Sequence, residues 1–355
     1  MRTHITRRSV IGASLAAAGT GALAACSGAG SDGHAGHGGS QNSGRGGNRS
    51  GAAEGFVSPD GKEVAAAEAE RGKGPERKVR LTAAPVRLDL GGRTVRSWAY
   101  GDRLPGQEIR ATAGDVLALT LANHLPEPTS LHWHGLALRN DMDGVPGLTQ
   151  RSIAPGADFR YRFALSHPGT YWFHPHSGVQ QDRGLYAPLI VEDPREPLAY
   201  DKEWVIVLDD WVDGVDGSTP DAVLDELRKG MSGGGGGGHE GHGMTGMMSR
   251  KEPEKTPAPG GPSRMMMGAA SDLLGGDAGD VAYPHYLING RTPDAPTSFR
   301  ARPGDRIRLR IINAGGDTAF RVALGGHEMT VTHTDGFPVR PAKTDALLLG
   351  MGERY

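Results

Sequence analysis

Apolar and polar residues alternate along much of the chain with a period of two, which is the spacing of a half-buried β-strand. Apolar residues recur at every second position across 86–90, and the Gly91-Gly92 pair then leads into a strand-like run at 94–100. This arrangement predicts a β-hairpin. Alternation resumes across 109–121. Short strands, turns rich in Gly and Pro, and few helical stretches together predict an all-β fold of antiparallel β-sandwiches.

The second half of the chain repeats the pattern of the first. Residues 109–123 and 299–313 share the spacing of their apolar positions, a Gly-Asp pair and a final Asn. Period-two strands also recur by chance, but the shared Gly-Asp and Asn positions favour duplication of a β-sandwich domain. Continued without gaps, the alignment places Val322 and Leu324 where the first copy has two histidines. The second copy therefore keeps the scaffold and lacks the ligands.

Composition divides the chain into segments. Residues 27–77 are rich in Gly, Ser, Ala and charge with almost no aromatic side chains, which predicts a disordered tether. We expect a first domain at 78–195, a short linker, and a second domain at 201–355 that opens with a strand near 204–208. Residues 220–229 have an acidic residue early and basic residues late, which favours a brief helix.

A long insertion rich in Gly, Met and His occupies about residues 231–280 of the second domain. A glycine run at 233–238 is followed by histidines and methionines before ordered pattern resumes near Val281. Thioether sulfur is a soft ligand suited to Cu(I), so a copper-collecting loop is one interpretation. A disordered, low-complexity excursion is the other, and the sequence does not choose between them.

The first 26 residues have the features of an export signal. Arg7 and Arg8 form a twin-arginine pattern ahead of an apolar run at 10–25 that is shorter than the ~20 residues of a membrane-spanning helix. The Leu-Ala-Ala-Cys sequence that ends at Cys26 resembles a bacterial lipoprotein cleavage box. We therefore predict export by the twin-arginine pathway to the cell envelope or beyond, with lipidation of Cys26. In the alternative, Cys26 is an ordinary small residue beside a cleavage site.

Charge and cysteine content narrow the function classes. Lys plus Arg number 39 and Asp plus Glu number 41, without a concentrated basic stripe, so we expect no nucleic-acid partner. A membrane contact is expected only through a lipid anchor. Cys26 is the only cysteine, so an intramolecular disulfide is impossible. Stability must come from packing and metal.

Two His-x-His pairs, His132 with His134 and His174 with His176, organise the first domain. Residues two apart on a strand point to the same face, so each pair can present two imidazoles to one side. The β-branched and aromatic run at 170–173 supports a strand before the second pair. If the two strands are neighbours, four imidazoles converge. Such a set suits zinc, copper, iron or nickel, so the pattern predicts a transition-metal site without naming the metal.

Three segments resemble those of the multicopper oxidases, a family that includes laccases and bacterial copper oxidases. Leu-His-Trp-His-Gly at 131–135 and Tyr-Trp-Phe-His-Pro-His-Ser-Gly at 171–178 resemble the first two copper motifs, and Asp-Gly-Val-Pro-Gly-Leu-Thr-Gln at 143–150 resembles the segment between them. The resemblance extends more loosely over 78–355 and implies tandem cupredoxin-like domains. It also implies one-electron oxidation of phenols, aromatic amines or Cu(I), coupled to reduction of molecular oxygen to water at a trinuclear copper cluster.

The same resemblance implies roles for individual residues. By motif, His132 would bind the type 2 copper, His134 and His174 one type 3 copper, and His176 the other. Asp143 matches an acidic residue thought to relay protons to the cluster. The alternative for Asp143 is a plain Asp-Gly turn.

The sequence also departs from the family pattern. It has no His-Cys-His motif, and Cys26 lies in the export signal, so the thiolate of a type 1 copper site is missing. The family's remaining cluster histidines come from a further C-terminal domain, while residues 349–355 read like the middle of a strand. We therefore predict half of a trinuclear site in a fragment of a longer, three-domain oxidase, inactive by itself.

Two other interpretations compete with an oxidase. One is a non-catalytic copper-binding or scaffold protein with half a cluster. The other is a zinc hydrolase with three histidines around an open water position, which ranks last because it lacks a placed general base and leaves the duplicated sandwich unexplained.

Some residues are expected to have no part in the metal site. Histidines without a motif placement are predicted to be structural or at the surface: His124, His167, His285, His327 and His333. His34 and His37 lie in the tether and are expected to be solvated, with a weak metal contact as the alternative. Trp133 and Trp172 are predicted to be packing residues and not electron relays.

Overall fold

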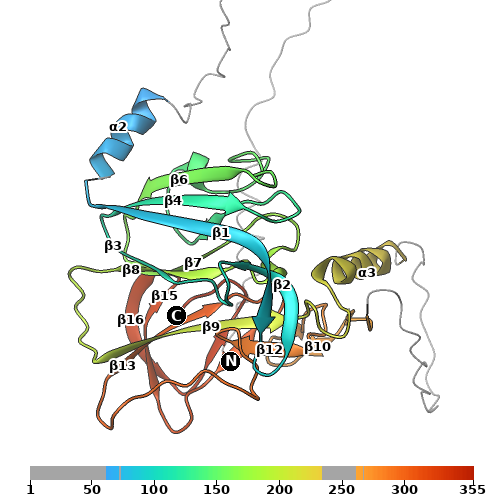
Figure 1. Ribbon diagram of the computed structural model, residues 1–355. Helices are drawn as coiled ribbons and strands as arrows, with labels where there is room; N and C mark the ends of the chain where they lie inside the picture. The colour runs from blue at the N-terminus through green and yellow to red at the C-terminus, as the bar shows by residue number, and fades with distance from the viewer. Residues whose placement is uncertain (1–60, 72, 234–260, 267) are drawn as a thin grey trace, which may run out of the picture. The chain divides into compact units, whose positions relative to one another are not determined.

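The computed structural model describes residues 61–71, 73–233, 261–266 and 268–355 (Figure 1). The predicted export signal, Cys26, the tether histidines and most of the tether lie outside these residues, as do residues 234–260 of the insertion. Within the described ranges, no helix has both the length and the apolar character needed to cross a membrane.

The first β-unit, formed by strands β1 to β8, consists of two four-stranded sheets that face each other. One sheet has the order β2 (Thr94–Tyr100), β1 (Glu76–Asp89), β4 (Val116–Asn123) and β6 (Asp158–Ala164). The other has the order β3 (Ile109–Thr112), β8 (Ala187–Glu192), β7 (Gly169–His174) and β5 (His132–His134). The predicted hairpin is confirmed, because β1 and β2 pair antiparallel across the two glycines.

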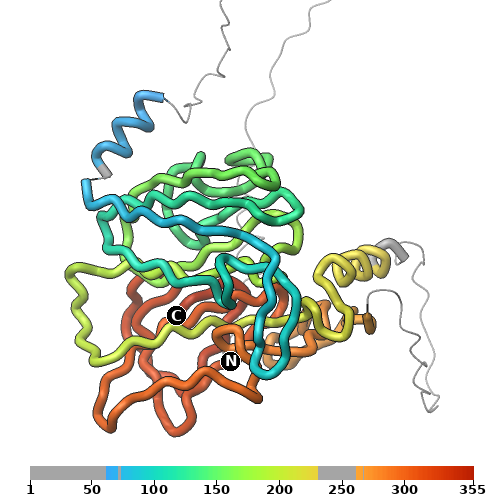
Figure 2. Tube along the Cα trace, in the orientation of Figure 1, coloured from blue at the N-terminus to red at the C-terminus, as the bar shows by residue number. Residues whose placement is uncertain are grey.

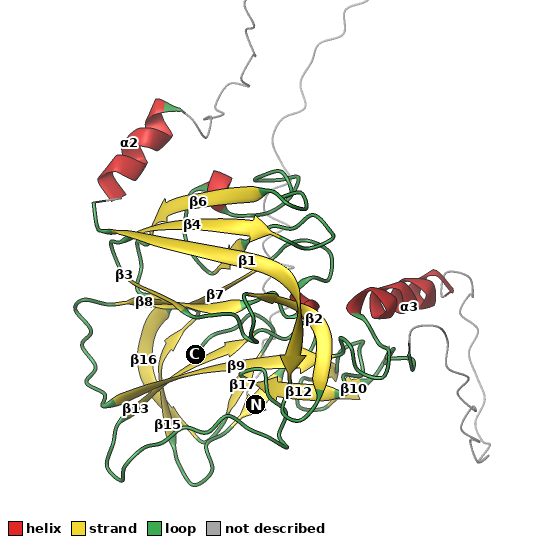
Figure 3. Cartoon of the chain, viewed as in Figure 1, coloured by secondary structure: helices red, strands yellow, loops and turns green. Residues whose placement is uncertain are grey.

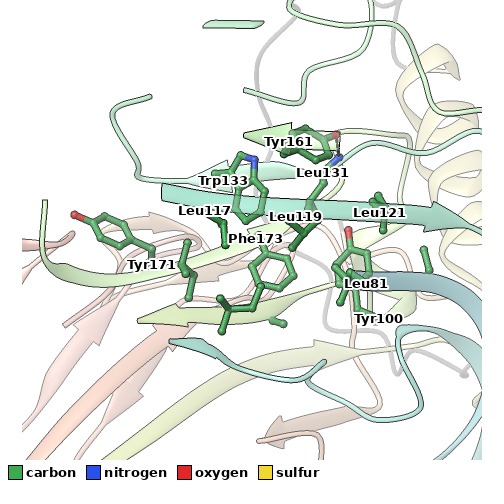
Figure 4. Packing of buried hydrophobic residues seen from close by; sticks show 14 of the residues in the cluster. Leu81, Tyr100, Leu117, Leu119, Leu121, Leu131, Trp133, Tyr161, Tyr171 and Phe173 are labelled. Atoms are coloured by element: carbon green, nitrogen blue, oxygen red, sulfur yellow. Dashed lines mark hydrogen bonds between the residues drawn. The ribbon is translucent and has the colours of Figure 1, made fainter. Parts of the chain in front are cut away.

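An aromatic core fills the space between these sheets (Figure 4). Trp133 of β5 is fully buried, with its ring centroid 4.9 Å from that of Phe163 and 5.6 Å from that of Phe173. Such aromatic pairs add about 0.5–1.5 kcal/mol beyond the area they bury. Trp133 is therefore a packing residue, as predicted. Because Trp133 points into the core, its neighbours His132 and His134 point to the opposite face of β5.

The second β-unit, formed by strands β9 to β17, contains one three-stranded sheet and smaller two-stranded ladders. The sheet has the order β12 (His285–Ile288), β9 (Lys202–Trp211) and β13 (Ile307–Asn313). The ladders are β14 (Phe320–Val322) with β17 (Leu347–Leu349), β15 (Met329–Thr334) with β16 (Phe337–Thr344), and β10 (Ala270–Ser271) with β11 (Gly276–Asp277). The strand predicted at 204–208 lies within β9, and the predicted helix lies within α3 (Pro220–Gly233).

Equivalent turns in the two β-units support the internal repeat. The side-chain amide of Asn123 donates to two backbone carbonyls while its oxygen accepts from the N–H two residues later, and Asn313 makes the same three contacts. Asp115 and Asp305 each accept a hydrogen bond from the N–H three residues earlier. The parallel pairing of β1 with β4 is matched by that of β9 with β13. Val322 and Leu324 supply no imidazole to the second unit.

Two sequence predictions need correction. The tether is not unstructured throughout, because α2 (Lys62–Arg71) lies within it and β1 begins at Glu76. The α2 sequence is dominated by Ala, Glu, Lys and Arg, which are strong helix formers. The second correction concerns the insertion, where described structure resumes at residue 261 and not near 281. There the Arg264 backbone N–H and guanidinium bond to Glu226 and Ser218, contacts that composition does not reveal.

The described residues belong to one compact unit in which the two β-units share buried clusters. The β1–β2 hairpin extends from the first unit onto the second, where Leu88 and Val95 join Trp211 and Leu287 in one buried cluster (Figure 2). Both described long helices, α2 and α3, lie outside the sheets (Figure 3). A further buried cluster contains Trp172, Tyr186, Val207 and Ile312. The strand that carries Trp172 therefore packs directly on the second unit.

Candidate metal centre

Pairing of β5 with β7 brings the two His-x-His pairs together. The antiparallel register places His132 opposite His174 and His134 opposite Trp172. His176 lies two residues beyond the end of β7 at His174. The ring centroids of His132 and His176 are 4.3 Å apart, and those of His134 and His174 are 5.5 Å apart. The predicted convergence of four imidazoles is confirmed.

Three of these histidines form a compact group. His132, His174 and His176 each offer one nitrogen, and the three atoms lie within 4.8 Å of one another. The fourth, His134, joins through Nδ1, which lies 3.2 Å from His174 Nε2. Two imidazole ligands of one tetrahedral ion, with bonds of about 2.0 Å, have nitrogens about 3.3 Å apart. The spacing of His134 and His174 therefore fits two ligands of a single ion.

Backbone carbonyls fix which ring nitrogens face the site. His132 Nδ1 lies 2.8 Å from the Asp143 carbonyl, and His174 Nδ1 lies 3.1 Å from the Pro175 carbonyl. A carbonyl only accepts, so both Nδ1 atoms donate, and the Nε2 lone pairs of His132 and His174 remain available to a ligand. His134 Nδ1 must then donate to His174 Nε2 when no ion is bound.

Asp143 lies directly beside His132. Its carbonyl accepts from His132 Nδ1, and its Oδ1 atom lies 3.4 Å from the same nitrogen. Asp143 follows the 3-10 turn Asn140–Met142 and precedes Gly144, which has φ of 82°. A Cβ at Gly144 would lie 1.8 Å from the Leu131 carbonyl oxygen, so this position requires glycine. Asp143 thus occupies a turn and also contacts a candidate ligand.

The environment favours the neutral form of three of these imidazoles, those of His134, His174 and His176. Burial, followed by the charges of His134 and His132, lowers the pKa of His174 well below its usual value. Burial, and then Arg354 and His132, lowers the pKa of His134 to about 4. The pKa of His176 is also lowered, first by burial and then by His132. Only a neutral imidazole has a lone pair for a metal, so these shifts favour metal binding at neutral pH.

Trp172 packs against two of the candidate ligands. Its ring stacks on His134 at 4.8 Å and on His174 at 4.3 Å between centroids, with interplanar angles of 26° and 20°. Trp172 is buried, and its Nε1 atom has no hydrogen-bond partner among the described residues. The predicted packing role is confirmed, although the surfaces that Trp172 packs against belong to the site itself.

Sequence reasoning missed several residues around the histidines. Ser130 Oγ accepts from the His176 backbone N–H at 3.0 Å, and the buried Arg354 lies close to His134. Arg354 belongs to a segment whose sequence pattern predicts only a strand. Nothing in that pattern indicates that Arg354 lies near the histidines. Among the described residues, the metal-competent group includes none of the histidines expected to lie apart from it: His124, His167, His285, His327 and His333.

Comparisons with known proteins agree with this geometry. Residues 83–196 and residues 266–355 match two family models, each described as multicopper oxidase. Multicopper oxidase MmcO of Mycobacterium tuberculosis is 53% identical over 275 residues, which are 78% of this chain and 50% of that protein. Copper resistance protein A of Pseudomonas syringae pv. tomato is 35% identical over 276 residues, covering 78% of this chain and 44% of the relative. The chain spans about half the length of the curated relatives it matches.

Solved structures show the same likeness. The laccase from Botrytis aclada matches with a TM-score of 0.59 and 28% identity, over 79% of this chain and 46% of the laccase. The multi-copper oxidase from Pseudomonas thermotolerans matches with a TM-score of 0.56 and 29% identity, over 79% of this chain and 57% of that protein. The predicted all-β, cupredoxin-like fold is confirmed. With its paired His-x-His strands and two matching family models, the chain belongs to the multicopper oxidase family.

Proposed function

We propose that this chain supplies part of the oxygen-reducing copper site of an oxidase that removes electrons singly from phenols, aromatic amines or Cu(I). The observation that carries the proposal is the convergence of four imidazoles on one face of the β5–β7 pair. Relatives named laccase, copper resistance protein and L-ascorbate oxidase support an oxidative role.

The donor set fits copper. Imidazole nitrogen is a common copper ligand, and the lowered pKa values of His134, His174 and His176 keep these rings unprotonated. Copper bound here would supply one-electron redox chemistry. The zinc-hydrolase interpretation gains no support from the family match.

We assign the residues as the resemblance implies. His132 serves the type 2 copper, His134 and His174 one type 3 copper, and His176 the other, within a trinuclear cluster. The 3.2 Å separation of His134 Nδ1 and His174 Nε2 supports the pairing of these two residues. Asp143 would relay protons beside His132 toward the metal site, a role supported by its carboxylate lying 3.4 Å from His132 Nδ1.

The same site suits a copper-binding protein without turnover, because His132, His174 and His176 alone form a metal-competent group. An oxygen electrode separates the two functions. We would continue the chain with the C-terminal half of the Mycobacterium tuberculosis relative, load it with copper, and add a phenol. An oxidase consumes oxygen, His132→Ala abolishes the uptake, and His124→Ala, an exposed control, leaves it unchanged. Copper binding without any uptake would favour the non-catalytic function.

We also propose two features of the whole protein. The two β-units correspond to domains at 78–195 and 201–355, which the repeated Asn and Asp turns support. The protein is exported by the twin-arginine pathway and anchored through lipidated Cys26, a proposal supported by the sequence at residues 1–26. Mass spectrometry of the mature N-terminus tests the anchor, and an unmodified terminus elsewhere would contradict it.

A further inference from the structure

Arg354 links the second β-unit to the strand that carries the second histidine pair. Its Nε donates to the carbonyl of Thr170 in β7 at 3.1 Å, and its guanidinium lies 5.9 Å from the centroid of the Tyr171 ring. Within its own unit, Arg354 Nη1 lies 3.0 Å from Asp335 Oδ1 and 3.0 Å from the Gly352 carbonyl. Only 4% of Arg354 is exposed, so these contacts hold a buried charge in one place.

Two glycines allow Arg354 and its turn to reach His134. Gly135, the residue after His134, has φ of 88°, which favours glycine, and a Cβ there would lie 2.1 Å from Arg354 Nη2. A Cβ on Gly352 would lie 2.7 Å from His134 Cε1 and 2.9 Å from His134 Nε2. The Gly352 turn therefore abuts the end of the His134 ring formed by Cε1 and Nε2, while the neighbouring Nδ1 faces His174.

This arrangement restricts how His134 can turn. Its ring is stacked on Trp172, so it can move only within the plane of the stack or by a flip about the Cβ–Cγ bond. A flip would put Cδ2, a carbon, in the place of Nδ1 and remove the nitrogen that faces His174. The Gly352 turn lies against the Cε1 and Nε2 end of the ring, and the hydrogen bonds from Arg354 to the Gly352 and Thr170 carbonyls hold that turn against β7.

We propose that Arg354 is a positioning residue for His134: by tying the Gly352 turn to β7, it keeps the His134 ring in the place where Nδ1 faces the metal site. The second β-unit, which supplies no predicted ligand, thus completes the wall of the site. The inference rests on the proposed function only for the statement that His134 binds a metal. The orientation of the ring can be tested without any metal.

Arg310 provides a matched control. It too is buried, with 7% exposed, and it also reaches Thr170, donating from Nη1 to Oγ1 at 3.1 Å. Its ion-pair partner is Glu203, at 2.7 Å, in place of Asp335. Arg310→Gln therefore removes a buried arginine between the same two β-units but leaves the Gly352 turn tied to β7. A role in general docking predicts equal effects for the two arginines, whereas positioning of His134 predicts an effect of Arg354 alone.

The first measurement is long-range 15N–1H NMR of the histidine rings in the metal-free chain, with His134 assigned from His134→Ala. We expect one His134 state, protonated at Nδ1, in the wild type and in the Arg310→Gln variant, which keeps Arg354. In Arg354→Gln we expect two or more averaged states, and Arg354→Lys should not restore the single state, because one ammonium cannot reproduce the guanidinium's several contacts. An unchanged His134 spectrum in Arg354→Gln, or an equal change in Arg310→Gln, overturns the proposal.

The second measurement is calorimetric titration with Cu(II). Loss of a group that orients a ligand typically weakens metal binding by 10–100-fold, so we expect at least about 10-fold for Arg354→Gln and little change for Arg310→Gln. If Arg354→Gln fails to fold, Gly352→Ala replaces it, since the new Cβ would push directly on the His134 ring. An undisturbed His134 signal in a folded Gly352→Ala chain then refutes the inference. Absence of copper binding by the wild type would count against the proposed function, and the NMR result would still decide the position of His134.

Discussion

His132 and His174 face each other as a register pair across antiparallel strands β5 and β7, with their ring centroids 5.6 Å apart. The next pair in the ladder, Trp133 with Phe173, points into the aromatic core. One ladder therefore supplies packing from one face and imidazoles from the other. The position of the metal site depends on the register of these few residues, because a slip by one would bury the histidines and expose the tryptophan.

The core face of this ladder leads to a prediction about stability. Trp133→Ala removes a fully buried indole that contacts Tyr161 and Phe163, so we expect it to lower the free energy of unfolding by about 3–5 kcal/mol. Denaturant unfolding measures this loss. Leu148→Ala, at a position that is 80% exposed, is the control and should change stability by less than about 0.5 kcal/mol. Equal stability of both variants would show that Trp133 does not hold the strand pair.

Stability should also depend on pH through His134. In the unfolded chain this histidine takes up a proton near its ordinary pKa of about 6.5, but in the folded protein burial and Arg354 lower its pKa to about 4. Between these values the unfolded state binds more protons, so acidification destabilises the fold. We expect a loss that begins near pH 6.5, is complete near pH 4 and amounts to at most about 3 kcal/mol, reduced by solvent screening.

Thermal unfolding across that pH window tests the effect. His134→Ala should flatten the dependence of the melting temperature on pH, and His124→Ala, which removes an exposed histidine, should leave the slope unchanged. A slope that survives in His134→Ala would assign the proton uptake to other groups, such as His174, whose pKa is also lowered by burial.

Asp143 allows a test that separates a proton relay from a turn. Asn is as acceptable as Asp in such a turn, and the Asp143 carbonyl that anchors His132 is unaffected by the side chain. Asp143→Asn should therefore leave Cu(II) affinity nearly unchanged. In the copper-loaded chimera with the C-terminal half of the relative, oxygen uptake should fall by about 100-fold, because an amide side chain cannot act as a general acid or base at neutral pH. Full activity of the Asp143→Asn variant would show that Asp143 serves only as a turn residue.

Local sequence pattern was sufficient for features that depend on neighbours in the chain. The period-two alternation around Trp133 placed His132 and His134 on one face, and the Gly-Asp and Asn positions revealed the repeat. The Arg354 contact with Thr170 joins residues 184 positions apart, and no periodicity encodes it. The glycine at position 135 is part of a recognised motif, but its positive φ and its close approach to the Arg354 guanidinium appear only in three dimensions.

The sequence likewise could not predict which ring nitrogen of each histidine faces the metal site. His132 and His174 are oriented by carbonyls of Asp143 and Pro175, one from a loop and one from the next residue, and neither contact follows from strand alternation. The missed helix α2 is a different case. Its Ala- and Glu-rich composition favours a helix, whereas the absence of aromatic residues around it is typical of a disordered segment.

The last prediction concerns the chain by itself. Its one cysteine is Cys26, in the predicted export signal, and the described residues contain no cysteine. Supplied with copper, the purified chain should bind the metal weakly and reversibly, with affinity falling as imidazoles protonate in acid. We expect neither the intense blue absorption of a copper–thiolate site nor oxygen uptake with a phenol. The chimera should show both, and His174→Ala in the chimera should abolish oxygen uptake while the blue absorption persists, because His174 lies in the imidazole group. Laccase turnover by the isolated chain would contradict this reasoning and indicate a redox site other than the one built by β5 and β7.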